Sequence, residues 1–318
     1  MNKENKIYGY VASGGGSKGA WGGGVSEYLI KDLKRNYKYL SGTSTGNLLM
    51  GLVASKEIDK LYQAYTSVTN KDIYSIPPYT IKSSKNGIFK TRMNYLRIAY
   101  NMFIRGKKTF GDSTVLREKT IPEFFTEENY NKVLKSDIEL ISTVTNLTHG
   151  KTEFKSNFDP GTGYKEFLDW MYASACAVPF MSIVNKNNYE YADGGYIQSI
   201  PIQPLIDRGC DEIDVILHRD PKLEISKSRN ALHIINRIID ITMWDSASND
   251  IALAKLKAKE KDVIINVYQP ELKLTNNSLV FDKKVMQGWW KDGYNYAKNV
   301  ECVSYMISGR KKPKLIKK

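Results

Sequence analysis

Three short segments of the chain carry residue types that together could perform acyl transfer. The segment Gly42-Thr43-Ser44-Thr45-Gly46 has the form G-x-S-x-G, which places a serine hydroxyl on a sharp, exposed turn between a strand and a helix. Residues 13–19 (SGGGSKG) offer unpaired backbone N–H groups at a helix N-terminus, a setting suited to an anion. Asp193-Gly194-Gly195 adds a carboxylate. The three segments predict a nucleophile, a loop that holds negative charge and a candidate base.

A serine nucleophile needs a base, because its hydroxyl is scarcely ionised at neutral pH. Histidine is the usual base, and the chain has His149 in a hairpin turn, His218 at a strand end and His233 on a polar helix face. A structural or solvated role is favoured for all three. Asp193 could accept the proton directly in a dry pocket that raises its pKa. Asp-Gly-Gly is also common in plain turns, so this motif alone does not decide.

The glycine-rich segment also allows a different interpretation. Gly14, Gly16 and Gly19 form G-x-G-x-x-G, which occurs in dinucleotide-binding loops. Such a loop needs an acidic residue at the end of the second strand, where this chain has residues 42–46 instead. A phosphate-binding Lys-Ser/Thr pair is missing as well. A non-catalytic nucleotide-binding module therefore remains the less favoured alternative.

The charge of the chain is concentrated in two segments. The net charge over 318 residues is +13, of which residues 81–120 hold +8 and residues 310–318 hold +6, so the remainder is −1. Cationic segments suit lipid headgroups or nucleic acid, and a solvated face with a basic tail is the plain alternative. No interleaving of aromatic and basic residues typical of RNA platforms is visible, which disfavours nucleic acid. We expect peripheral contact with an anionic membrane surface.

Cysteine usage and hydropathy restrict the cellular setting. The three cysteines, Cys176, Cys210 and Cys302, are widely spaced, which disfavours a disulfide framework or a zinc site and fits a reducing compartment. Neither a signal peptide nor a run of 18 apolar residues is visible. The expectation is a cytoplasmic protein, peripheral at membranes, without metal or cofactor.

The pattern of elements predicts an α/β fold. Strands at residues 7–12 and 37–40 are each followed by a helix, at 20–34 and 47–65, and this opening favours a parallel sheet with right-handed crossovers. Later elements are strands at 137–144, 151–155, 189–192, 214–217 and 262–268, and helices at 164–175, 231–244, 251–261 and 283–300. We predict a single domain over residues 1–309 and a basic tail over 310–318.

Residues 70–130 interrupt this rhythm and are predicted to be an insertion. Between Asn94 and Arg105 the spacing indicates a helix with a narrow polar stripe, formed by Asn94, Arg97, Asn101 and Arg105. The rest of its surface is apolar. An apolar arc this wide is either buried against the body of the protein or placed in an interface, and core packing is the more common explanation.

Taken together and in this order, the motifs resemble the patatin-like phospholipases. That family has a G-G-G-x-[RK]-G loop, a G-x-S-x-G turn and a later D-G-[GA], which correspond here to residues 14–19, 42–46 and 193–195. Residues 173–180 (ASACAVPF) and 19–25 (GAWGGGV) are similar to two further family stretches, and the resemblance spans roughly residues 7–270. The chain departs from the pattern at Ser13, where the family often has an acidic residue.

The resemblance implies a three-layer sandwich with a mostly parallel central sheet and helices on both faces. It also implies a dyad without histidine, in which Ser44 is the nucleophile and Asp193 the base. The N–H groups of Gly15 and Gly16 would form the oxyanion hole, with Gly14 shaping the turn. Lys18 would orient the loop or meet a headgroup. The supporting motif residues are Ser17, Lys18, Gly19, Gly42, Thr43, Thr45, Gly46, Gly194 and Gly195.

The implied activity is lipid acyl hydrolysis of the phospholipase A or lysophospholipase type, with no cofactor. The substrate would be a phospholipid or lysophospholipid. An acyltransferase using the same dyad is the alternative within this class. Residues 70–130 match no named pattern, and we expect them to form a lid or substrate-facing insertion that determines substrate choice.

Overall fold

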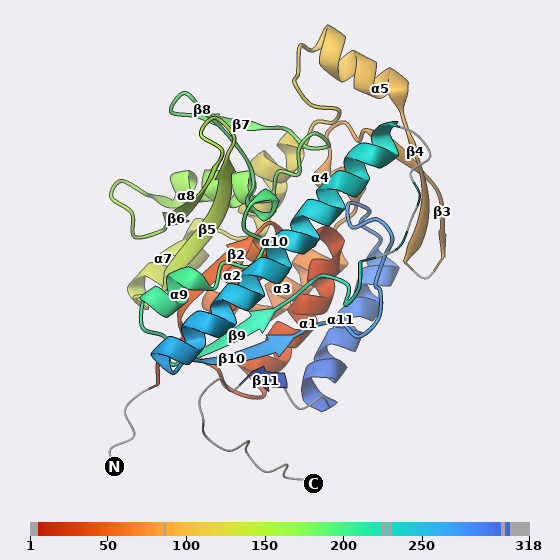
Figure 1. Ribbon diagram of the computed structural model, residues 1–318. Helices are drawn as coiled ribbons and strands as arrows, with labels where there is room; N and C mark the ends of the chain where they lie inside the picture. The colour runs from red at the N-terminus through yellow and green to blue at the C-terminus, as the bar shows by residue number, and fades with distance from the viewer. Residues whose placement is uncertain are drawn as a thin grey trace, which may run out of the picture.

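A computed structural model describes residues 6–85, 87–223, 225, 227, 231–299 and 303–305. The predicted basic tail (310–318), Cys302 and the side chain of His233 lie outside this description. The main sheet has nine strands: β1 (Tyr8–Ala12), β2 (Tyr37–Thr43), β5 (Glu139–Asn146), β6 (Lys151–Ser156), β7 (Val184–Lys186), β8 (Tyr189–Asp193), β9 (Glu212–Ile216), β10 (Ile264–Tyr268) and β11 (Val303–Tyr305). Their order is β11-β10-β9-β1-β2-β5-β8-β7, and β6 also pairs with β5 (Figure 1).

The centre of the sheet is parallel and its margins are antiparallel. Strands β10, β9, β1, β2 and β5 pair in parallel, whereas β11, β6, β8 and β7 pair antiparallel with their neighbours. The central strands are almost wholly buried, as expected for a parallel sheet covered on both faces. The α/β prediction is confirmed.

Helices cover both faces of the sheet, and each face has its own apolar core. One face carries α1 (Gly19–Lys31), α2 (Thr45–Ala54), α3 (Ile58–Thr66), α8 (Tyr164–Ala175) and α11 (Lys283–Asn299). The other carries α9 (Gln203–Asp207) and the long α10 (Ala231–Lys261), which crosses the sheet in Figure 1. The architecture is the expected three-layer sandwich. In the described part of the chain, no helix combines the length and apolarity needed to cross a membrane.

Two helix predictions were wrong in their extent. The predicted helix over 47–65 is two helices, because the chain turns at Lys56, whose φ is +60°, and Ser55 closes α2 by donating to the carbonyl of Gly51 at 3.0 Å. Both pieces bury the same side, so the apolar periodicity hides the break. Conversely, 231–244 and 251–261 form the single helix α10. The polar residues between them hold tertiary contacts, since Ser246 and Asp250 bond the backbone near residues 197–200.

Residues 70–135 contain a series of short elements, and of these the sequence pattern predicted only the helix of residues 94–105. They are α4 (Asn70–Ile73), the hairpin β3 (Tyr79–Lys85) and β4 (Ile88–Met93), α5 (Tyr95–Ala99), its continuation η2 (Tyr100–Ile104), η3 (Leu116–Thr120), α6 (Ile121–Phe124) and α7 (Glu127–Lys135). The helix expected over 94–105 therefore forms as α5 and η2. The prediction that its apolar side packs into the core is wrong, because Leu96 is 86% exposed and Phe103 is 80% exposed.

Candidate active site

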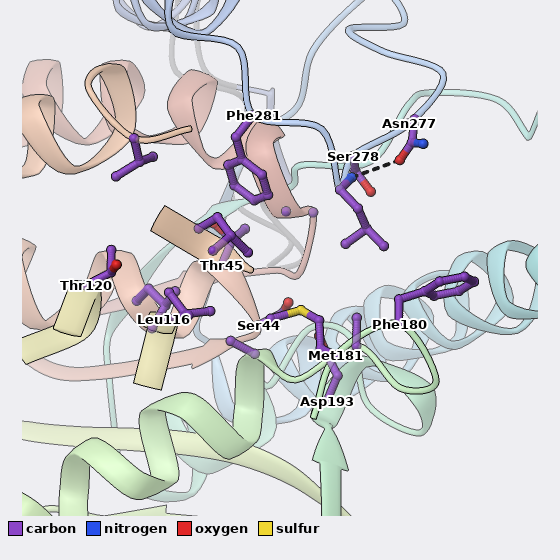
Figure 2. Close-up of a pocket in the computed structure, with 18 of the residues that line it drawn as sticks. Ser44, Thr45, Leu116, Thr120, Phe180, Met181, Asp193, Asn277, Ser278 and Phe281 are labelled. Atoms are coloured by element: carbon purple, nitrogen blue, oxygen red, sulfur yellow. Dashed lines mark hydrogen bonds between the residues drawn. The ribbon is translucent and has the colours of Figure 1, made fainter. Parts of the chain in front are cut away.

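Strand pairing brings the predicted nucleophile and base together. Strand β6 occupies one edge of β5 from Ile141 to Asn146. Strands β2 and β8 therefore share the other edge, β2 ending opposite Thr143 and β8 opposite Val144. They run in opposite directions and meet end to end. Ser44 follows the last residue of β2 and Asp193 is the last residue of β8, so their side chains face the same space (Figure 2).

Ser44 lies on a strained turn at the start of α2. Its φ of +55° and ψ of −126° are unusual for a residue with a Cβ, as expected of a nucleophile held by its surroundings. The N–H of Ser44 donates to the Ser174 hydroxyl at 3.0 Å. Gly46 allows the turn to approach β1, since a Cβ there would lie 2.1 Å from the carbonyl oxygen of Ala12. The side chain itself is 8% exposed and borders a cavity.

Asp193 is a buried carboxylate that is poorly solvated. Its Oδ1 accepts the N–H of Gly195 at 2.9 Å, and its carbonyl oxygen accepts the Thr145 hydroxyl at 2.9 Å. Burial raises the pKa of Asp193 from 3.8 to about 6, against the opposing effects of hydrogen bonds from Ser44 and Gly195. A base with a pKa near the working pH is suited to proton transfer.

The glycine-rich loop borders the same space. Gly15 and Gly16 line the cavity with Ser44, and a Cβ on Gly14 would lie 3.2 Å from the Cβ of Ser44. No hydrogen bond among the described residues uses the N–H groups of Gly14, Gly15 or Gly16. Gly16 has φ +54° and packs against the Ser278 carbonyl, which accepts the N–H of Ser17 at 2.8 Å. The loop thus presents free donors beside the serine.

The histidines that the structure describes lie away from this space. His218 is fully buried beneath the loop, where its backbone N–H donates to the Ser13 hydroxyl and its Nδ1 lies 2.7 Å from the Ser13 carbonyl oxygen. Burial lowers the pKa of His218 to about 4, so its ring is uncharged at neutral pH. His149 is exposed, and its ring packs at a tilt against Tyr189. The position of His149 thus fits the solvated role and that of His218 the structural role, in which it supports the glycine loop.

The remaining motif residues build the turns around the site. Lys18 Nζ lies 3.7 Å from Asp220, which favours the loop-orienting role over contact with a headgroup. Thr45 bonds the Tyr65 hydroxyl at 2.8 Å, and Gly19 packs against both. The other positions, which are buried at strand ends or in tight turns, are Ser17, Gly42, Thr43, Gly194 and Gly195.

A cavity of about 320 Å³ extends from Ser44 and Asp193. Its walls are mainly apolar, and the side chains come from α2, α8, α10, the 70–130 segment and the loops that follow α3 and α8: Leu48, Leu52, Val68, Tyr79, Met93, Leu116, Ile121, Phe125, Met171, Met181, Ile239 and Met243. Sequence reasoning missed Ser174 and the wall formed by residues 276–279 and 281. For Ser174 the signal was the 173–180 stretch, whereas the polar residues 275–278 resemble an ordinary turn.

The fold and this cavity define a three-layer α/β protein with an apolar pocket where its central strands end. The family model described as Patatin-like phospholipase matches residues 10–206. The chain therefore belongs to the patatin-like phospholipase family, and membership supports lipid acyl hydrolase activity in general terms.

A solved structure resembles the fold of this chain. The crystal structure of VipD from Legionella pneumophila is similar at 14% identity and a TM-score of 0.49, covering 92% of this chain. The chain spans 66% of the VipD chain, and a likeness of this size carries no argument about activity. No curated protein sequence matches the chain.

Proposed function

We propose that the protein is a lipid acyl hydrolase that cleaves carboxylic esters through Ser44 and Asp193. The observation that carries this proposal is the end-to-end meeting of β2 and β8, which sets a strained serine beside a buried carboxylate in an apolar cavity. A carboxylate with a raised pKa is a better proton acceptor than a solvated one.

In the proposed reaction, Asp193 takes the proton of Ser44 as its Oγ attacks the ester carbonyl carbon. The negative charge that develops on the carbonyl oxygen is held by the N–H groups of Gly15 and Gly16. The tetrahedral intermediate collapses, Asp193 returns the proton to the leaving alcohol and an acyl-serine remains. Water, deprotonated by the same carboxylate, then releases the fatty acid and restores Ser44.

The cavity supports a substrate with a long acyl chain. Its volume lies at the lower end of the usual range for small-ligand sites. Because its walls are apolar, burying a hydrocarbon chain in it is favourable in free energy. A phospholipid or lysophospholipid with one chain inserted suits this shape. Residues of the 70–130 segment form part of the wall, which supports a role for that segment in substrate choice.

Fatty acid release together with covalent labelling tests the proposal. We expect a fluorophosphonate to modify the protein on Ser44, located by peptide mass spectrometry, and we expect fatty acid release from lysophospholipid vesicles or micelles. Adding an alcohol acceptor and measuring acylated product separates hydrolysis from acyl transfer. Modification of another serine, or no ester cleavage with any acyl substrate, would contradict the proposed function.

The pH dependence should report the ionisation of Asp193. Because only the carboxylate can accept the serine proton, kcat/KM should rise with pH through about 6 and fall about tenfold per pH unit below it. A soluble short-chain ester, which needs no lipid surface, is the substrate for this measurement. A profile that stays flat down to pH 4 would contradict the role of Asp193.

A matched control is available in Asp250. Burial also raises the pKa of this residue to about 6, but it accepts the N–H of Ile200 at 2.8 Å and does not line the cavity. Asp250→Asn should therefore keep the acid limb of the profile. Loss of that limb in this variant would assign the titration to Asp250 instead.

A further inference from the structure

The helix formed by α5 and η2 turns Asn101 of its polar stripe inward and most of its large apolar side chains outward. Asn101 is fully buried, whereas five large apolar side chains on the same helix are half to almost fully exposed. We call these five the apolar ridge: Tyr95, Leu96, Tyr100, Phe103 and Ile104. This orientation is the reverse of that in an ordinary surface helix, whose apolar stripe faces the core.

Hydrogen bonds hold the helix in this orientation. The Asn101 amide donates to the carbonyl oxygens of Thr109 and Gly111, at 2.9 and 3.2 Å. Arg105 donates to Asn101 Oδ1 at 3.1 Å and pairs with the buried Asp112 at 2.5 Å. Turning the ridge inward would break these bonds and leave buried polar groups without partners, which is costly. The exposed ridge is therefore built into the fold.

Both ends of this helix connect to the rim of the cavity. Met93, which ends β4 just before α5, lines the cavity. Beyond η2, the N–H of Phe110 donates to the carbonyl of Pro179 at 2.7 Å, and its ring packs edge-on against Phe180, another lining residue. The ridge thus lies next to the margin of the pocket that contains Ser44. In Figure 1, the helix α5 stands out from the rest of the fold.

The segment that carries the ridge is strongly cationic. Between residues 81 and 111 the chain has eight lysines and arginines and no acidic residue. Arg105 is committed to Asp112 and Lys108 pairs with Glu190. Five other cations are exposed and form no ion pair with a carboxylate in the described part of the chain: Lys82, Lys90, Arg92, Arg97 and Lys107.

We propose that the apolar ridge and these five cations dock the protein on an anionic phospholipid bilayer, with the cavity mouth facing the lipid. Apolar side chains flanked by lysine and arginine fit the boundary between acyl chains and acidic headgroups. A second copy of this chain fits less well, because a symmetric contact would set this cationic segment close to itself. The inference extends the proposed function, since docking would place Ser44 where a lipid can enter.

Vesicle co-sedimentation of the full chain tests docking without turnover when all proteins carry Ser44→Ala. Phosphatidylcholine vesicles with and without phosphatidylserine are the probe. We expect binding that requires phosphatidylserine and weakens with salt. Leu96→Ser/Phe103→Ser/Ile104→Ser should lower partitioning by at least about tenfold. Arg92→Gln/Arg97→Gln/Lys107→Gln should lower it about a hundredfold at low salt.

Matched controls remove similar groups elsewhere on the surface. Leu253→Ser/Leu256→Ser removes exposed leucines from the C-terminal half of α10, and Lys34→Gln/Lys135→Gln/Lys259→Gln removes three exposed lysines. Both controls should bind within a few-fold of the parent. Equal loss in controls and test variants, or equal binding to vesicles without phosphatidylserine, would overturn the proposal. So would a dimer in light scattering that the ridge substitutions abolish.

Activity separates this proposal from the proposed function. With Ser44 intact, the ridge and cation variants should lose hydrolysis of vesicle lipid and keep hydrolysis of a soluble short-chain ester. Vesicle hydrolysis unchanged in both variants would overturn docking while the hydrolase assignment stands. If the parent protein cleaved no ester, the hydrolase assignment would be wrong. Docking would then be supported or overturned by the co-sedimentation result alone.

Discussion

Replacing Ser44 by alanine should lower kcat/KM for a soluble ester by about 10⁴-fold or more, with the fold intact. The substitution removes the atom that would carry the acyl group, so the remaining rate reflects only binding and the oxyanion donors. The backbone N–H of residue 44 can still donate to Ser174. Initial rates and thermal unfolding of the same preparations measure the two effects. A variant that keeps normal turnover would rule out Ser44 as the nucleophile.

Asp193→Asn belongs to the same prediction and should cause a similar loss. An asparagine can still accept the N–H of Gly195, but it cannot take a proton from Ser44. The effects on the rate of substituting residues that act together are not additive. The Ser44→Ala/Asp193→Asn double variant should therefore be no slower than the slower single variant. Asp250 is a half-buried carboxylate outside the cavity, so Asp250→Asn is the control and should retain activity.

Stability should change in the opposite direction to activity in Asp193→Asn. The rise of the Asp193 pKa from 3.8 to about 6 means that burial disfavours the charged form by about 3 kcal/mol. Above pH 6 the folded wild-type protein carries this penalty, and below about 4 it does not. At neutral pH the variant should therefore unfold at an equal or higher temperature. A marked destabilisation would mean that lost activity reports misfolding.

Removing one N–H group from the glycine-rich loop should lower kcat by roughly 10²–10³-fold. A side chain cannot make this test at Gly15, because its Cβ would lie 2.3 Å from the Cβ of His218. Replacing Gly15 by glycolic acid changes the amide to an ester and removes only the donor. Semisynthesis of the N-terminal segment would supply this protein, and its kcat can be compared with that of the all-amide chain.

Gly14 offers the matched control for this second prediction. Its N–H group is also unused in the described hydrogen bonds, but its expected role is to shape the turn rather than to donate. The same replacement at Gly14 should leave kcat within a few-fold, whereas replacement at Gly16 should resemble that at Gly15. Equal rates for all three esters would place the oxyanion donors elsewhere.

The local parts of the site could be predicted from the sequence, because they depend on neighbouring residues. A glycine at position 46 and a serine two residues earlier specify a tight strand-to-helix turn, and Ser44 lies on one. The α/β class followed from the alternation of strands and helices near the N-terminus. Of the structural or solvated role favoured for His218, its complete burial supports the structural one.

The non-local parts could not be predicted. That Asp193 faces Ser44 depends on β8 taking the edge of β5 which β2 leaves free, and no local pattern specifies such pairing. The periodicity of residues 94–105 gave the width of the apolar arc but not its direction. Asn101 decided that direction through bonds to Thr109 and Gly111, which lie in a loop that turns back on the helix.

The pairing between β5 and β8 is short, and this affects how easily the region around Asp193 opens. The ladder has three residue pairs, from Val144–Asp193 to Asn146–Tyr191, and the N–H of Leu147 adds one bond to the carbonyl of Glu190 just beyond it. Protein segments open locally at a lower free energy than global unfolding, especially where few backbone bonds hold them. An opening confined to this ladder would move the carboxylate away from the serine and loosen Tyr191 and Ala192 from one core, while the core on the other face stays packed. Under the proposed mechanism, we therefore expect activity to be lost at a lower free energy than the fold as a whole.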